Sequence, residues 1–225
     1  MLFHAPSATF PVHPTYIFVN GKSSLVNRVI DIWPSIRILD VATVDKGIPI
    51  NVPSAIQALS SDASGHRWNY SSAHVPAPPV QALHDLELYP DRMSRAPLAE
   101  SSVLAQVHTL RLPGVSAVDL PTAVLTGLQS LVIGWLPIVE TFSLPRSLRH
   151  LGYHPEYHPF EKDEQVQILL AAVRARTELE LFTATRYSSP AVLKQFESVC
   201  GELGVEFLVY PEPACFPHPR NVDWI

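Results

Sequence analysis

One short pattern, apolar-x-x-Leu-x-apolar, recurs along this chain and constrains its fold more than any single residue does. Clear copies occupy residues 36–41, 83–88, 107–112, 128–133 and 148–153, and a looser copy is Leu179-Glu-Leu181. From Leu86 onward, the central positions of the copies follow one another at intervals of 24, 21, 20 and 28 residues. An interval of that length holds one strand and one returning segment, which cannot bury an apolar side alone. Neighbouring units are therefore expected to stack and share one elongated core.

Intervals of about 20–29 residues are typical of leucine-rich repeats. We predict an α/β fold, an irregular leucine-rich-repeat solenoid with parallel strands on its concave face and helices on its convex face. We expect irregularity because the asparagine that regular repeats place after the strand is missing. The equivalent positions hold Asp91, Val115, Leu136, Glu156 and Ala184. The alternative is an open α/β sheet with helices on both faces, which also alternates strands and helices.

Other elements follow from apolar periodicity and from helix start and stop signals. We expect strands at 16–19 and 205–210, and helices at 23–32, 161–176 and from Pro190 to the glycines at 201 and 204. The stretch between Leu39 and Leu86 is less regular. There we predict a helix over 53–59 and a long insertion over about residues 43–79, with one degenerate repeat as the alternative. The whole chain, 1–225, is then a single repeat domain that ends in a proline-rich cap at 211–225.

Composition narrows the class of protein. With 47% apolar and 16% charged residues, the chain resembles an ordered, well-packed protein. Two cysteines, Cys200 and Cys215, are too few for a disulfide framework, so we expect an intracellular protein, cytoplasmic or nuclear. Residues 1–14 lack the pattern of a signal peptide. The uncharged run 120–139 is long enough to span a membrane, but its prolines and polar residues favour the repeat interpretation.

The net charge of −5, with its acidic excess in the C-terminal third, bears on partners. Nucleic acids are bound through a basic stripe that neutralises phosphates, and this chain has none. An anionic membrane surface also attracts basic segments. We therefore predict neither a nucleic-acid nor a membrane partner.

Two stretches carry a family resemblance. They are residues 148–151 with the helix that follows, and residues 179–186 continuing through 204–213. Together they resemble the C-terminal repeats of fungal F-box leucine-rich-repeat proteins, over about residues 100–225. The resemblance implies the substrate-recognition repeat region of an F-box-like ubiquitin-ligase receptor. The F-box itself is not found, because residues 1–22 contain prolines, aromatic residues and an expected strand instead of a helical module.

The strongest candidate for catalysis or metal binding is the histidine series His150, His154 and His158. Histidines four apart can share a helix face and bind zinc. Here His150 lies in an expected strand, and Pro155 and Pro159 break any helix through the other two. We therefore expect solvent-facing histidines, no metal, no cofactor and no catalytic residue, in a protein that is not an enzyme. A small hydrolase or metal-dependent enzyme built on these three histidines is the alternative function.

Binding residues follow from strand geometry, since side chains alternate between the two faces of a sheet. The residues between the core positions are predicted to project from the concave face. The candidates are Asp85, Glu87, Tyr89, Arg111, His150, His154, Glu178, Glu180 and Phe182, with Asp40, Thr109, Ser130 and Val132 beside them. Tyr89 and Phe182 are the expected aromatic anchors. The acidic C-terminal end predicts a protein partner that is at least partly basic.

Overall fold

The computed structural model describes residues 14–43, 50–51, 55–61, 68–69, 85–88, 105–112, 123, 125–136, 143–155 and 161–211, with the backbone alone at 43, 51, 61, 68–69 and 85–88. These residues form an α/β fold with two sheets of parallel strands and three helices. The strands are β1 (Tyr16–Gly21), β2 (Ile38–Thr43), β3 (Ile50–Asn51), β4 (Ala58–Ser61), β5 (Trp68–Asn69), β6 (Asp85–Leu88), β7 (Thr109–Leu112), β8 (Ser130–Ile133), β9 (His150–Tyr153), β10 (Leu181–Thr185) and β11 (Glu206–Tyr210). The helices are α1 (Ser23–Ile32), α3 (Asp163–Arg174) and α4 (Pro190–Leu203).

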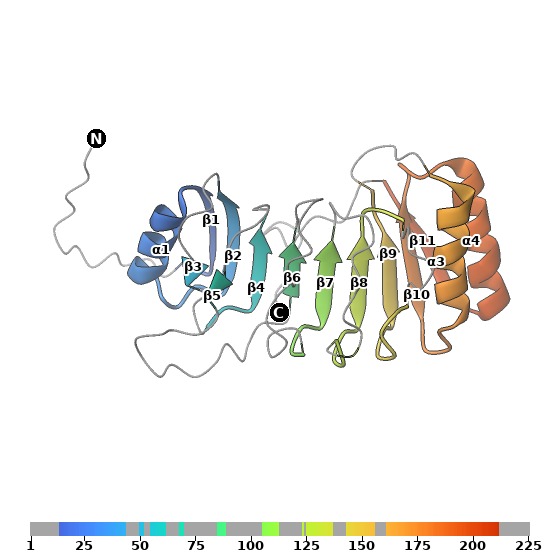
Figure 1. Ribbon diagram of the computed structural model, residues 1–225, viewed down its shortest axis with the longest axis horizontal. Helices are drawn as coiled ribbons and strands as arrows, with labels where there is room; N and C mark the ends of the chain where they lie inside the picture. Colours follow the sequence, from blue (N-terminus) through green and yellow to red (C-terminus); the bar gives the residue numbers. More distant parts are fainter. Residues whose placement is uncertain are drawn as a thin grey trace.

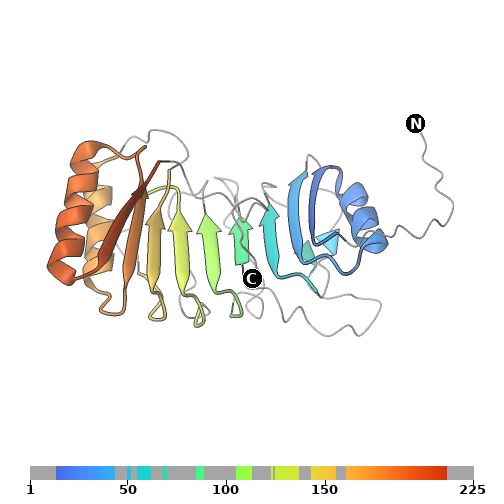
Figure 2. The same ribbon diagram turned by 180° about the vertical axis from the view of Figure 1, so that it is seen from behind.

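The larger sheet contains nine strands that follow the order of the chain, β1-β2-β4-β6-β7-β8-β9-β10-β11. Every neighbouring pair is parallel, so the chain must return to the same end of the sheet after each strand. Figure 1 shows the resulting row of strands, with α1 at one end and α3 and α4 at the other. In the view from behind, β11 lies in front of α3 (Figure 2). β3 and β5 form the separate two-stranded sheet.

The recurring sequence pattern is the core of this sheet. Its central positions lie side by side across all nine strands: Ile17, Leu39, Leu59, Leu86, Leu110, Leu131, Leu151, Phe182 and Phe207. Three residues before these positions, a second buried series contains Ile36, Ile56, Val107, Leu128, Leu148 and Leu179. Two residues after them, a third contains Val41, Leu112, Ile133, Tyr153 and Ala184. The buried members of the three series belong to one continuous hydrophobic cluster.

Helices cover one face of the sheet only, among the residues that the structure describes. Val26 and Ile30 of α1, Leu169 of α3 and Phe196 of α4 belong to the same cluster as the central positions. Because side chains alternate along each strand, all three helices must pack on the face that carries those positions. The alternative architecture, with helices on both faces, is not what these residues form.

A backbone hydrogen-bond motif repeats with the units. The carbonyl oxygens of Arg37, His108, Gln129 and Arg149 stand just before β2, β7, β8 and β9, and each accepts from two successive N–H groups of the next unit. The repetition shows that successive units enter the sheet with the same backbone geometry. It fixes the register of the strands, and register decides which side chains share a face.

Between Leu39 and Leu86 the structure differs from the sequence-based prediction. A helix over 53–59 was expected, but Ala58–Ser61 is strand β4, which pairs with both β2 and β6. Ile56 and Leu59 are fully buried and fill the first and central positions of the pattern, so an insertion without a strand is wrong here. The unit was hidden because Ser61 replaces the third apolar residue. The single-domain boundaries and the cap at 211–225 extend outside the described residues and stay predictions.

The two C-terminal helices match their sequence signals. α4 begins with Ser189, whose Oγ accepts a hydrogen bond from the Val192 N–H, followed by Pro190 at the first helical position. It ends at Gly204, which has a left-handed φ of 70°, whereas Gly201 lies inside the helix. Nowhere among the described residues is there a helix with the length and apolarity needed to cross a membrane. The uncharged run 120–139 lies partly outside those residues.

Candidate functional site

The sheet face opposite the helices, called here the open face, carries its own two series of side-by-side residues. The first is Tyr16, Ile38, Ala58, Asp85, Thr109, Ser130, His150, Leu181 and Glu206. The second is Phe18, Asp40, Ser60, Glu87, Arg111, Val132, Gly152, Thr183 and Leu208. Alternation thus places Asp40, Thr109, Arg111, Ser130, Val132 and His150 on the predicted face. The backbone of Asp85 and Glu87 stands in register with these two series.

Three of these side chains and His154, which follows β9, form a continuous hydrogen-bonded group, the polar cluster. It consists of Ser130, His150, Thr183 and His154. Ser130 Oγ lies 2.7 Å from His150 Nδ1, and His150 Nε2 lies 2.8 Å from Thr183 Oγ1. The same Thr183 oxygen lies 2.8 Å from His154 Nε2. The Tyr210 ring stands edge-on to the His154 ring, with 5.9 Å between centroids. The cluster therefore ties β8, β9 and β10 together on the open face, and β11 borders it.

Burial fixes the protonation state of the two histidines. His154 is only 2% exposed, so the prediction that it faces solvent is wrong, and Thr183 is buried beneath the two imidazoles. Burial, reinforced by the positive charge of Arg111, lowers the pKa of His150 to about 4. Burial also lowers the pKa of His154 to about 4, with smaller contributions from His150 and Arg111. Both rings are therefore neutral at neutral pH, each with one donor nitrogen and one acceptor nitrogen.

The cluster exists because residue 152 has no side chain. A Cβ on Gly152 would lie 3.0 Å from Thr183 Oγ1, 3.1 Å from Val132 Cγ2 and 3.2 Å from His154 Nε2. Those separations are shorter than ordinary contacts, so a larger residue would push the shared hydroxyl or the buried ring aside. The polar cluster thus depends on glycine at the strand position where the neighbouring units carry Arg111 and Val132.

The geometry of the cluster suits hydrogen bonding better than nucleophilic catalysis. In a serine–histidine catalytic pair, a third group orients the imidazole through its second nitrogen, and the histidine must accept a proton near neutral pH. Here both nitrogens of His150 meet hydroxyl groups, from Ser130 and Thr183. A pKa near 4 also makes His150 a weak base at pH 7.

The histidine series is brought together in part. The Nε2 atoms of His150 and His154 converge on one oxygen, as a metal site would require of two ligands. Within the described residues, no three His, Cys, Asp or Glu side chains are grouped as metal ligands would be. His158 and Glu156 lie outside those residues, and so does Cys215. The metal alternative stays a prediction.

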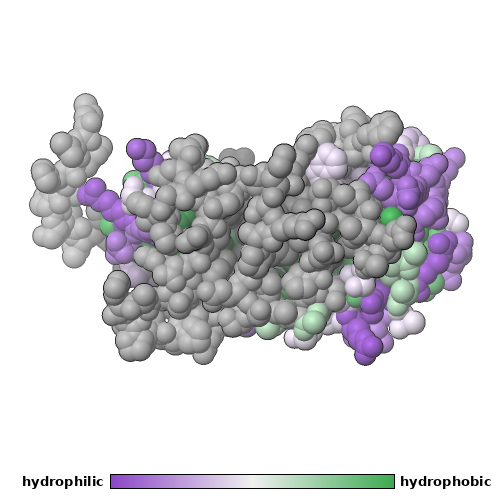
Figure 3. All heavy atoms as spheres, viewed as in Figure 1, coloured by the Kyte–Doolittle hydropathy of each residue, from purple (hydrophilic) through white to green (hydrophobic). Residues whose placement is uncertain are grey.

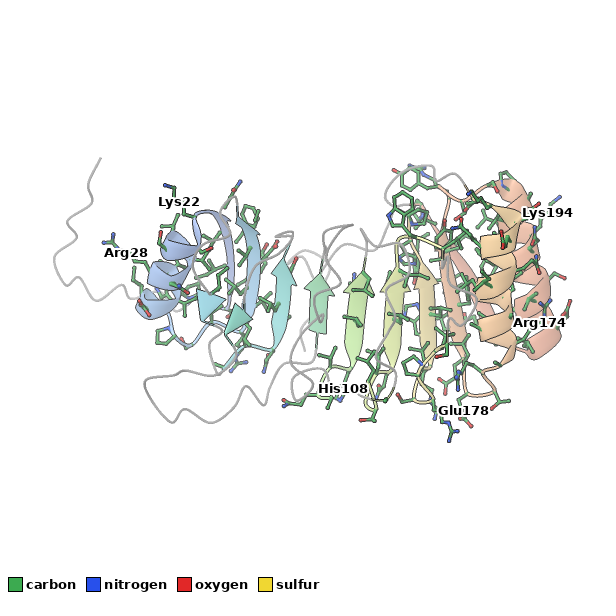
Figure 4. All side chains as sticks on the ribbon, viewed as in Figure 1. Lys22, Arg28, His108, Arg174, Glu178 and Lys194 are labelled. Carbon is green, nitrogen blue, oxygen red and sulfur yellow. The ribbon has the colours of Figure 1, made fainter. Side chains whose placement is uncertain are left out.

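The acidic pair lies at the rim of the sheet. Glu178 and Glu180 precede β10, and Glu178 is found with His108 at the edge where the strands begin (Figure 4). Both carboxylates are exposed and share Arg149, whose guanidinium nitrogen lies 3.1 Å from Glu178 and 2.9 Å from Glu180. One guanidinium group thus offsets part of their charge. The acidic C-terminal end should therefore attract a basic partner less strongly than the sequence alone suggests.

Phe182 corrects another prediction. It was expected on the concave face, but it is fully buried on the helix side, with its ring 4.9 Å from that of Phe196. The central position of the pattern falls three residues later than expected, at Phe182, and Leu179 takes the first position. Because side chains alternate along a strand, this odd shift exchanges the two faces, and Leu181 lies on the open face. Tyr89, the other expected anchor, lies outside the described residues.

Sequence reasoning missed Thr183 and Gly152. The signal for Gly152 was available, because the copy Leu-Gly-Tyr has glycine where other copies carry a charged or branched residue. On the opposite side, α3 borders a shallow groove of about 510 Å³ that includes Ile168, Ala171 and Ala175. Hydrophilic side chains surround this region over α3 and α4 (Figure 3). The groove is separated from the polar cluster by the sheet.

Comparison with known proteins gives no relative: no family model, no curated protein and no solved structure matches this chain.

Proposed function

We propose that this chain is a leucine-rich-repeat solenoid that serves as a non-enzymatic scaffold for binding another protein through its open face. The observation that carries the proposal is the open face itself, which runs across nine parallel strands in register. The successive central positions are 20 to 31 residues apart, close to the period of leucine-rich repeats, and each unit adds one strand. Such surfaces commonly hold protein partners.

The exposed side chains of the open face suit protein recognition. Phe18 is 54% exposed and Tyr210 41%, which gives each end of the face an aromatic side chain. Between them lie Asp40, Thr109 and Arg111, which are partly exposed and polar or charged. Aromatic and arginine side chains dominate the energetics of many interfaces, while polar neighbours supply specificity.

The sequence resemblance makes the proposal more specific. It suggests that the partner is a substrate held for ubiquitin transfer, so that the chain is the recognition region of an F-box-like receptor. That reading requires an intracellular protein. It also requires that an adaptor-binding module act with this chain.

The test compares capture of partners by the wild-type chain and by a variant of the open face. Arg111→Glu with Thr109→Arg alters the middle of the face, and Lys194→Glu with Gln167→Arg is the matched control on α3 and α4. We expect proteins captured from a lysate of the source cells to be lost with the first variant and retained with the second. Equal capture by all three chains contradicts the proposed face. In the receptor reading, inhibiting the proteasome raises the amount of the captured protein.

A second candidate function, a hydrolase or metal-dependent enzyme at His150, His154 and His158, is favoured by one observation. Two imidazole nitrogens converge on the Thr183 hydroxyl, and Ser130 Oγ lies 2.7 Å from the other nitrogen of His150. Zinc analysis of the purified chain and labelling with a fluorophosphonate separate it from the scaffold. Labelling that is lost in Ser130→Ala establishes the enzyme and overturns the scaffold proposal, whereas stoichiometric zinc contradicts a scaffold without a metal site.

A further inference from the structure

The last strand of the nine-stranded sheet has one edge that pairs with β10 and one that does not. The Glu206 N–H donates to the Glu180 carbonyl, and the Tyr210 carbonyl accepts from the Arg186 N–H. Since a residue in a strand directs its N–H and C=O to the same side, residues 206, 208 and 210 bond inward. Phe207 and Val209 then direct their N–H and C=O groups outward. Among the described residues, β11 has β10 as its single strand partner.

This edge is apolar on both of its faces. Leu208, Val209 and Tyr210 are 38%, 46% and 41% exposed, although they are large hydrophobic residues. Sheet edges are usually protected by lysines, prolines or bulges within the strand, and β11 (Glu-Phe-Leu-Val-Tyr) has none of these. An exposed edge of this kind is a template for another strand.

We propose that β11 pairs with β11 of a second copy of this chain, antiparallel, about a two-fold axis at Leu208. The two outward residues, Phe207 and Val209, are symmetric about Leu208. Each therefore meets the other type in the second copy, and the two pairs exchange four backbone hydrogen bonds. Centring the axis on Val209 would place Phe207 opposite Pro211, which has no N–H to donate. Self-complementarity of this kind is what a two-fold interface requires.

The charges agree with the same register. Glu206 is the only residue of β11 that is charged at neutral pH, and the two-fold axis places it opposite the phenol of Tyr210 from the second copy. The two Glu206 carboxylates stand at opposite ends of the paired strands, so they do not repel each other closely. Val209 packs against Phe207 of the second copy on one face of the joined sheets, and Leu208 packs against Leu208 on the other.

The two-fold axis can be tested specifically, because Leu208 of one copy lies opposite Leu208 of the other. Leu208→Lys and Leu208→Glu should each weaken dimerisation at least tenfold, since like charges meet at the axis. Mixing the two variants should restore a heterodimer, which sedimentation or light scattering detects. Leu25→Lys is the matched control, because Leu25 is a 46% exposed leucine on α1. That variant should dimerise as the wild type does.

A backbone variant tests the hydrogen bonds separately. Val209→Pro removes an N–H that points away from β10, so the fold should survive while dimerisation weakens. Circular dichroism confirms that the variant is folded. A wild-type chain that stays monomeric at about 100 μM overturns the proposal, since an interface weaker than that is not specific at cellular concentrations. Assemblies larger than a dimer, or a lysine–glutamate mixture that fails to recover, overturn the register. The dimer does not rest on the proposed binding function, although Tyr210 takes part in both.

Discussion

Replacing Thr183 by valine tests whether the polar cluster holds the C-terminal strands together. The two side chains have nearly the same shape, so the change removes one hydroxyl without opening a cavity. That hydroxyl joins His150 and His154 at 2.8 Å each and is buried beneath them. The variant therefore leaves two imidazole nitrogens without this partner, one of them on a ring that is 2% exposed.

The magnitude follows from burial. A buried polar atom that loses its partner costs about 1–3 kcal/mol, and His154 Nε2 should lie in that range. His150 is half-buried, so water can replace part of its lost bond and its cost is about 1 kcal/mol. The buried methyl group of valine offsets part of both terms. We expect the free energy of unfolding to fall by about 2–3 kcal/mol, which lowers Tm by about 5–10 °C in a chain of this size.

Urea denaturation followed by tryptophan fluorescence measures this change as a shift of the midpoint. Thr177→Val is the matched control, because Thr177 is exposed between α3 and β10. It should stay within about 0.5 kcal/mol of the wild type. If Thr183→Val also stays within that range, the shared hydroxyl does not stabilise the fold, and our interpretation of the polar cluster is wrong.

Three further predictions concern the same end of the sheet. The folded-state pKa values of His150 and His154 lie near 4, below the ordinary value of 6.5. The free energy of unfolding should therefore have its full value above pH 6.5 and fall by about 3 kcal/mol as the pH drops towards 4. Urea titrations at several pH values measure this loss. It should disappear when both histidines are changed to glutamine. Gly152→Ala should lower the unfolding free energy by about 1–3 kcal/mol, because its Cβ would crowd the shared hydroxyl at 3.0 Å. Gly201→Ala, whose Cβ meets nothing within 4 Å, should raise it by about 0.5–1 kcal/mol, and calorimetry measures both changes. Phe182→Ala should cost about 3–5 kcal/mol by chemical denaturation, and a loss below 1 kcal/mol would place the ring on the open face after all.

The parallel sheet could be predicted from the sequence because its signal is repeated. Apart from the β4 unit, each copy whose side chains the structure describes contributes three buried positions, and the order of the copies gives the order of the strands. One degenerate position was enough to hide a unit, as Ser61 did for β4. A serine is tolerated there because the first two buried positions, Ile56 and Leu59, still hold the unit in the core. Period is therefore a safer guide than the third position of the pattern.

The polar cluster could be predicted from the sequence only in part. Once the leucines are in register, the residues just before Leu131 and Leu151 must be neighbours, so the contact between Ser130 and His150 could be predicted. Thr183 could not be placed, because its position depends on Phe182 rather than Leu179 taking the central position of β10. Burial of His154 depends on the missing side chain of Gly152, which is a packing effect across strands. Sequence periodicity identifies the face on which a side chain lies, whereas contacts between side chains of neighbouring strands depend on the exact register.

The two ends of the sheet follow from the same physics as its middle. A unit that contacts only its neighbours buries its strand between two others, so every inner strand has both edges paired. Within the part of the chain that the structure describes, β1 and β11 have one neighbouring strand each, and in β11 the side chains of Leu208, Val209 and Tyr210 are all exposed. A sheet built by repeating one unit therefore has an unpaired strand edge at each end, and such an edge can pair with another strand. Pairing with a second copy removes that edge for both chains, while their open faces stay available to other proteins.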